Sequence, residues 1–174
     1  QMCIRDSVNP FQVRLVAKKG RIYNRTWTPL DLAYCAAQTR DAGIETDILD
    51  ANAEQIGPEA VAERAKGFDK VFITSTSLDR WQCPHLDLQP FFENVAALRE
   101  VVPEVHVMGS HGTVKPEEVL RETNATTVIR GEPEITSLAL AKGASPDDVL
   151  GITYFKDGEV VHQPDQKACL LYTS

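Results

Sequence analysis

The stretch KVFITSTSLDRWQCPHLDLQPFFENVAALREVVPEVHVM, residues 70–108, decides the fold of this chain. Its two ends are short apolar runs, KVFIT (70–74) and VHVM (105–108). Between them, a segment that opens at Pro90 repeats apolar residues at helical spacing, as Phe91, Val95, Leu98 and Val102. A helix between two apolar strands is typical of a parallel βαβ unit covered on both faces. The stretch therefore predicts the centre of an α/β sheet.

The same alternation extends on both sides of this stretch. Further strand-like runs are VRLVA (13–17), ETDILD (45–50) and TTVIR (126–130). Helices are predicted to begin beside prolines, which favour a first helical turn because that position needs no backbone N–H; these are Pro29, Pro58, Pro90, Pro116 and Pro133. The pattern predicts a Rossmann-like (flavodoxin-like) α/β fold, with a five-stranded parallel sheet and helices on both faces, over residues 8–150.

A different pattern begins after Gly151. The extended runs ITYF and EVVH are separated by Lys156-Asp157-Gly158, and Asp-Gly between extended runs is a strong signal for a tight turn. Residues 151–164 are therefore expected to form a C-terminal β-hairpin and the start of a linker.

The first helix carries the clearest start and stop signals. Thr28 is the expected N-cap, with Asp31 completing a capping-box-like pair, and Gly43 is the expected stop. Its predicted buried stripe consists of Leu30, Ala33, Tyr34 and Ala37.

The two ends of the chain match neither the period nor the propensity of their surroundings. QMCIRDS (1–7) and CLLYTS (169–174) each resemble the translated transposon-end DNA of a sequencing adapter, read in opposite orientations. The alternative is an ordinary frayed tail at each end. We expect the natural stretch, from about residue 8 to 167 or 168, to be a fragment of a longer protein. Its remaining cysteines, Cys35 and Cys83, indicate a reducing compartment and no disulfide framework.

Composition narrows the classes of partner. The chain has 174 residues, of which 43% are hydrophobic and 25% are charged, as in a soluble globular domain. No apolar run approaches the roughly 20 residues that span a bilayer, and no signal peptide opens the chain, so we expect a cytoplasmic protein without a membrane partner. The net charge of −7 argues against a nucleic-acid surface. Small molecules or proteins are the expected partners.

In an open parallel sheet, ligands bind beyond the carboxyl ends of the strands. Asp50, after the second predicted strand, could hold the ribose of a dinucleotide, but the first loop lacks G-x-G-x-x-G because Gly20 is the only glycine between residues 13 and 29. No G-x-x-x-x-G-K-[ST] motif follows any strand, which excludes a P-loop. A receiver domain would need acidic residues after strand one, where Lys18 and Lys19 stand instead.

Small hydroxyl residues and glycines follow the last three predicted strands of the sheet. Such residues open a slot lined by hydroxyls and amides, suited to a flat group with a phosphate-bearing tail. The alternative is that glycine and serine are simply common at strand-to-helix turns. The candidate binding residues are Thr74, Ser75, Thr76 and Ser77; Gly109, Ser110, His111 and Gly112; and Arg130, Gly131 and Glu132.

Five segments in order carry a family resemblance: TPLDLAYCAAQTRDAG (28–43), ILDANAE (48–54), ITSTSLDRWQCP (73–84), VMGSHGTVKPEEVL (107–120) and VIRGEPE (128–134). The set resembles the cobalamin-binding domain at the front of cobalamin-dependent radical S-adenosylmethionine enzymes. The resemblance implies that the dimethylbenzimidazole tail of cobalamin threads between sheet and helices. It implies tail contacts for Ser75, Ser77, Gly109, Ser110, Gly131 and Glu132.

Two departures qualify the resemblance. Domains that ligate cobalt from below use Asp-x-His-x-x-Gly after strand one, and the corresponding loop here has no histidine. Cobalamin is therefore expected to bind base-off, without a lower histidine ligand. The Cys-x-x-x-Cys-x-x-Cys motif that holds a four-iron cluster is also missing. The cluster, S-adenosylmethionine and the catalytic barrel of the parent, a methyltransferase or related enzyme, are expected outside this chain, which should be inactive alone.

Several alternatives stay open. The domain could be a flavodoxin-like binding or regulatory module for another small molecule, or a scaffold that has lost its cofactor. His111 is expected to make a polar contact rather than to ligate a metal, because no second ligand stands at metal spacing. Arg130 could meet a phosphate or propionamide, or form an ordinary salt bridge.

Overall fold

A seven-stranded sheet, in the order β4-β1-β5-β6-β7-β8-β9, forms the body of the protein. The computed structural model describes residues 3–8, 17–18, 21–22, 29–76 and 88–167. The strands from β4 to β7 are parallel, and β8 and β9 continue the sheet antiparallel. The strands are β1 (Cys3–Val8), β2 (Ala17–Lys18), β3 (Arg21–Ile22), β4 (Glu45–Thr46), β5 (Lys70–Thr74), β6 (Glu104–Met108), β7 (Thr127–Ile129), β8 (Ile152–Lys156) and β9 (Glu159–His162).

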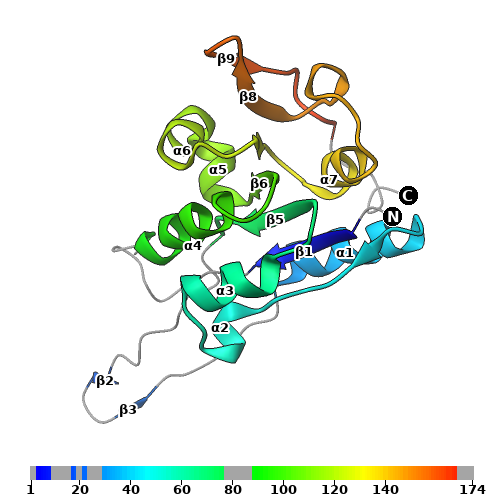
Figure 1. The fold of residues 1–174 in the computed structure, drawn as a ribbon. Helices are drawn as coiled ribbons and strands as arrows, with labels where there is room; N and C mark the ends of the chain where they lie inside the picture. Colours follow the sequence, from blue (N-terminus) through cyan, green and yellow to red (C-terminus); the bar gives the residue numbers. More distant parts are fainter. Residues whose placement is uncertain (1–2, 9–16, 19–20, 23–28, 77–87, 168–174) are drawn as a thin grey trace.

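Helices cover both faces of this sheet (Figure 1). On β5, Val71 and Ile73 belong to one apolar core and Phe72 to the other, because successive side chains of a strand point to opposite faces. The first core also contains buried residues of α3, α4 and α6, and the second those of α1 and α7. The helices are α1 (Leu30–Asp41), α2 (Ala51–Glu54), α3 (Pro58–Ala65), α4 (Gln89–Arg99), α5 (Ser110–Val114), α6 (Pro116–Thr123), α7 (Glu134–Ala141) and the 3₁₀ turn η1 (Pro146–Asp148). The predicted fold class is confirmed.

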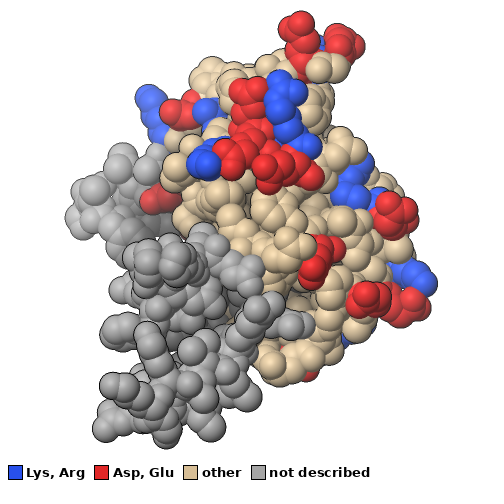
Figure 2. All heavy atoms as spheres, turned by 90° about the vertical axis from the view of Figure 1, so that its left-hand side faces the viewer, with Lys and Arg blue, Asp and Glu red and all other residues tan. Residues whose placement is uncertain are grey.

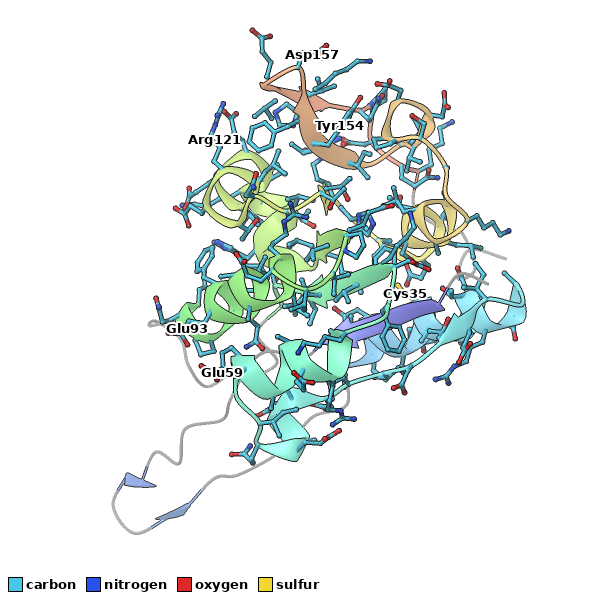
Figure 3. All side chains as sticks on the ribbon, viewed as in Figure 1. Cys35, Glu59, Glu93, Arg121, Tyr154 and Asp157 are labelled. Carbon is cyan, nitrogen blue, oxygen red and sulfur yellow. The ribbon has the colours of Figure 1, made fainter. Side chains whose placement is uncertain are left out.

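The C-terminal hairpin is also confirmed. Phe155 of β8 pairs with Val160 of β9, and both Asp157 and Gly158 have positive φ, as a two-residue hairpin turn requires. Asp157 marks the tip of the hairpin in Figure 3. No helix within the described residues is long and apolar enough to cross a membrane.

The first strand differs from the prediction. The place between β4 and β5 is taken by β1, Cys3–Val8, whereas the sequence predicts a strand at 13–17. Residues 13–16 lie outside the described part of the chain, and Ala17 pairs with Ile22 in a separate two-stranded ribbon. Strand pairing uses the backbone groups that every non-proline residue offers, so two extended segments close in sequence can suit the same place. The adapter origin proposed for residues 1–7 remains a prediction.

The predicted buried face of the first helix is wrong. Leu30 and Tyr34 are 59% and 53% exposed, whereas the buried residues of α1 are Leu32, Cys35, Ala36 and Thr39. Apolar residues occur on both sides of this helix, so periodicity alone could not select the face. Figure 3 shows Cys35 on the side of α1 that meets the sheet.

A polar cluster is buried near the amino ends of the parallel strands. His106 of β6 is 1% exposed, stacks on Phe72 at 4.8 Å between ring centroids, and has Nδ1 2.9 Å from Thr127 Oγ1. Lys70 Nζ donates to Glu104 Oε2 at 2.6 Å, and the same carboxylate oxygen lies 3.4 Å from His106 Nε2. The contacts with His106 and Lys70 lower the pKa of Glu104 from 4.5 to about 2 despite partial burial. Burial lowers the pKa of His106 below its usual 6.5, against the pull of Glu104.

This cluster predicts loss of stability in acid. Both groups have a lower pKa in the folded than in the unfolded state, so the unfolded chain binds more protons and gains population as pH falls. The contribution of His106 should fade as pH falls below 6.5, and that of Glu104 between pH 4.5 and about 2. Urea unfolding from pH 8 to 2 should show both declines, with Lys70 and Arg99 as the fixed positive charges that oppose protonation of His106.

The control for this prediction is His106→Gln, which should lose the decline that begins at pH 6.5 and should keep a smaller form of the lower one, because Lys70 still lowers the pKa of Glu104. His162→Gln in β9 removes a histidine that is 43% exposed and should leave the profile unchanged. An identical pH profile in His106→Gln and wild type would contradict the assignment.

Candidate functional site

The loops that follow β5 and β6 are joined through one buried serine. Ser75 is fully buried, and both its backbone N–H and its hydroxyl donate to the carbonyl of Met108, at 2.6 and 2.7 Å. The hydroxyl also accepts from the N–H of Gly112 at 2.9 Å. Ser75 therefore holds the end of β5 against the end of β6 and the start of α5. The single proton of its hydroxyl is used within the protein.

Gly109 lies where the two loops approach most closely. Its φ is +101°, a conformation that side chains rarely allow. A Cβ at this position would lie 2.5 Å from Thr76 Oγ1, 2.8 Å from Thr74 Oγ1 and 2.8 Å from the Thr76 backbone N. The absence of a side chain at Gly109 is therefore what allows the hydroxyls of Thr74 and Thr76 to sit at this edge.

Gly112 serves a related purpose in α5. A Cβ there would lie 3.0 Å from Val128 Cγ1, so glycine lets α5 pack directly on the sheet. The next residue, Thr113, extends the connection to the loop after β7. Its hydroxyl donates to the carbonyl of Gly109 at 2.9 Å and accepts from the N–H of Gly131 at 3.0 Å. The ends of β5, β6 and β7 thus share one network of hydroxyl–backbone hydrogen bonds.

The predicted residues divide between those inside this network and those outside it. Thr74, Ser75, Thr76, Ser110 and Gly131 make hydrogen bonds that belong to it, and Gly109 and Gly112 pack within it. His111 is half-buried in α5, Glu132 is exposed, and Ser77 lies outside the described residues.

Arg130 faces a different part of the molecule. Its guanidinium donates to the carbonyl of Gln163 and lies 3.0 Å from Asp165 Oδ1, while its backbone N–H donates to Gly151 at 2.7 Å. The structure therefore favours the salt-bridge alternative for Arg130. The arginine fixes the segment that follows β9 beside the end of β7.

Sequence reasoning missed two members of the network. Asp31, taken as part of a helix cap, accepts a hydrogen bond from Thr74 Oγ1 at 2.7 Å, and Thr28 lies outside the described residues. Thr113 lies within VMGSHGTVKPEEVL (107–120) but is not among the candidate binding residues that the sequence predicts. Its position four residues after Gly109 on a helix, from which a threonine hydroxyl can reach back to that carbonyl, was the available signal.

The described groups of the network are mostly uncharged: apart from the carboxylate of Asp31, they are hydroxyls, glycines and backbone groups. Figure 2 shows the left-hand side of Figure 1, where Lys, Arg, Asp and Glu gather toward the top and one side and leave an uncharged expanse between them and the grey atoms. Among the residues that the structure describes, no three His, Cys, Asp or Glu side chains could together hold a metal ion. Among the described residues, what the edge offers a ligand is glycine and hydroxyl groups.

Residues 23–141 match the family described as B12 binding domain. This chain belongs to the B12-binding domain family. Cobalamin is therefore the ligand of the domain, and the sheet edge just described fits it. An edge with hydroxyl groups and with glycines at Gly109 and Gly131 suits a bulky ligand whose periphery carries uncharged amides.

The chain is also similar to one curated protein and to two solved structures. The chain is 31% identical over 154 residues to the uncharacterized methyltransferase PH0819 of Pyrococcus horikoshii. This match covers 83% of the chain described here and 31% of PH0819. Two structures of the radical S-adenosylmethionine methyltransferase TsrM from Kitasatospora setae share the B12 domain's fold. The one with cobalamin and a [4Fe-4S] cluster has TM-score 0.77 at 15% identity, covering all of this chain and 31% of TsrM. The one with tryptophan and a S-adenosylmethionine analogue has TM-score 0.75 at 16% identity, covering 92% and 30%. The chain thus spans less than a third of the relatives it matches.

Proposed function

We propose that this B12 domain binds cobalamin base-off, with the nucleotide tail along the edge formed by the ends of β5, β6 and β7. The observation that carries the proposal is the network that joins Ser75, Thr113 and Gly131 into one surface. Thr76 and Ser110 stand at its open side. Thr76 is half-buried, and its hydroxyl accepts from the Ser110 N–H at 3.0 Å, so its own proton is directed elsewhere.

The histidines of the described residues support the base-off part of the proposal. His106 is buried in the middle of β6, and His162 lies in β9 next to Thr153. His111 is the described histidine nearest the edge, and no histidine occurs between residues 1 and 84. The loop after the first strand therefore has no histidine that could ligate the cobalt of a cobalamin bound at this edge.

The parent enzyme is proposed to be a cobalamin-dependent radical S-adenosylmethionine methyltransferase or a related enzyme. The support is the likeness to TsrM and to PH0819, each about three times as long as this chain. The iron–sulfur cluster and S-adenosylmethionine would belong to the rest of that protein. Bound cobalamin would supply methyl-group or electron transfer, and the residues described here would hold and orient it. We place the domain in the cytoplasm on its composition.

Titration with hydroxocobalamin followed by gel filtration tests the cofactor assignment. The corrinoid should elute with the protein, and after reduction to cob(II)alamin its electron paramagnetic resonance lines should lack splitting from an axial nitrogen. His111→Ala and His85→Ala should leave this spectrum unchanged. Nitrogen splitting that persists in both histidine variants would come from dimethylbenzimidazole and would overturn the base-off proposal. Splitting that disappears in His111→Ala would instead identify a histidine ligand and overturn the absence of one. No co-elution would leave two alternatives: the missing part of the parent is needed to hold the corrinoid, or the domain is a scaffold that has lost its cofactor.

A further inference from the structure

Asp31 holds two elements that lie far apart in the sequence. Its Oδ1 accepts from the backbone N–H of Leu32 at 2.9 Å, within the first turn of α1. Its Oδ2 accepts from the hydroxyl of Thr74 at 2.7 Å, 43 residues away at the end of β5. A carboxylate only accepts hydrogen bonds, so the Thr74 hydroxyl must be the donor in this pair.

The direction of the Thr74 bond matters for the rest of the edge. Because the hydroxyl of Thr74 donates its hydrogen bond to Asp31, the hydroxyl oxygen can accept a hydrogen bond from the Thr76 N–H, at 3.2 Å. The hydroxyl of Thr76 in turn accepts from the Ser110 N–H at 3.0 Å. Three hydrogen bonds thus run from α1 through the end of β5 to the first residue of α5.

The Thr74 side chain cannot turn to water if Asp31 is lost. Thr74 is fully buried, and a Cβ at Gly109 would lie 2.8 Å from its Oγ1, so the hydroxyl has little room. Without the carboxylate, its proton would need another acceptor within the edge, and any rotation would disturb the bond from Thr76. A buried donor without a partner is costly, so the local structure would rearrange.

We propose that Asp31 is a positioning residue for cobalamin, acting through Thr74 to set the geometry of Thr76 and Ser110. This inference rests on the proposed function, which places the nucleotide tail at that edge. The inference gives the first turn of α1 an indirect part in binding: Asp31 acts on the ligand only through Thr74. The role is specific to ligands that reach Thr76 and Ser110.

The test compares two corrinoids that differ in the tail. Hydroxocobalamin carries the nucleotide, and dicyanocobinamide lacks it. Asp31→Asn and Thr74→Val should each weaken hydroxocobalamin binding about tenfold and leave dicyanocobinamide binding within twofold. The double variant should bind hydroxocobalamin no more weakly than the single variant with the larger loss of affinity, because both substitutions break the same path of hydrogen bonds. Asp41→Asn, which removes the same charge from the exposed last residue of α1, is the control and should bind like wild type.

The outcomes separate this inference from the proposed function. A purely structural role would weaken both corrinoids alike, and additive effects of the two variants would show that they do not share a path; either result overturns the role of Asp31. Unchanged binding of hydroxocobalamin by Asp31→Asn overturns it as well. If wild type itself binds neither corrinoid, the proposed function fails first and the role of Asp31 falls with it.

Discussion

Gly109→Ala is expected to weaken hydroxocobalamin binding on the order of 100-fold, which corresponds to about 3 kcal/mol. The new methyl group would stand 2.5 Å from Thr76 Oγ1 and 2.8 Å from the Thr76 backbone N, and real Cβ atoms do not approach so closely. The backbone of the β5 loop must therefore move, and it carries the Thr76 hydroxyl with it. The φ of +101° adds strain for any residue other than glycine.

Gly143→Ala is the matched control for this prediction, because Gly143 follows α7 and is not part of the hydroxyl network. Gly143 also has a positive φ, +81°, but nothing lies within 4 Å of where its Cβ would stand. It should therefore lose about 1–2 kcal/mol of folding free energy through backbone strain alone. Gly109→Ala should lose about 2–5 kcal/mol because overlap adds to strain. Urea unfolding and hydroxocobalamin titration of both variants measure the difference; equal losses would show that the close approach at Gly109 does not shape the site.

Deletion of residues 1–7 should leave the fold and the cofactor binding intact. We propose that these residues are foreign to the domain, and the sequence offers VRLVA (13–17) as a strand for the same central place. The deletion is a demanding test of this proposal, because β1 pairs with both β4 and β5 in the structure. If Cys3–Val8 were the native strand, its removal would split the sheet and cost more than the roughly 5–15 kcal/mol that stabilises a domain.

Circular dichroism and urea unfolding of the chain that begins at Val8 distinguish these outcomes. An unfolding midpoint close to that of the full chain is the expected result. A chain without cooperative unfolding would assign the central strand to Cys3–Val8 and overturn the adapter origin of residues 1–7. Deletion of residues 169–174 is the control, since no strand or helix of the described part includes them.

The parts of the fold with strong local signals could be predicted from the sequence. KVFIT and EVHVM form β5 and β6, and α3 and α6 begin at Pro58 and Pro116 as expected. These signals are local, since proline fixes the start of a helix and an apolar run fixes a buried strand. Where two answers fit the same local pattern, sequence reasoning failed. α1 has apolar residues on two sides, and the central place of the sheet had two candidate strands.

The site could be predicted as a set of loops and not as a set of contacts. Thr74, Ser75, Gly109 and Gly131 were identified because small and hydroxyl residues follow parallel strands. The use of each hydroxyl could not be foreseen, because it depends on distances between loops. The hydroxyls of Ser75 and Thr74 donate hydrogen bonds to Met108 and Asp31 within the protein, and only the folded chain shows these partners.

The hydroxyl network determines when the described residues of this edge become ordered, relative to the binding of the cofactor. The N–H groups of Ser110 and Gly112 are bound to hydroxyls of the loop after β5, and that of Gly131 to a hydroxyl of α5. All three bonds exist in the chain by itself. The described residues of this edge are therefore ordered during folding rather than during encounter with the cofactor. If the tail binds there as we propose, we expect the rate of capture to be governed by diffusion and orientation, and the lifetime of the complex by how slowly the tail withdraws.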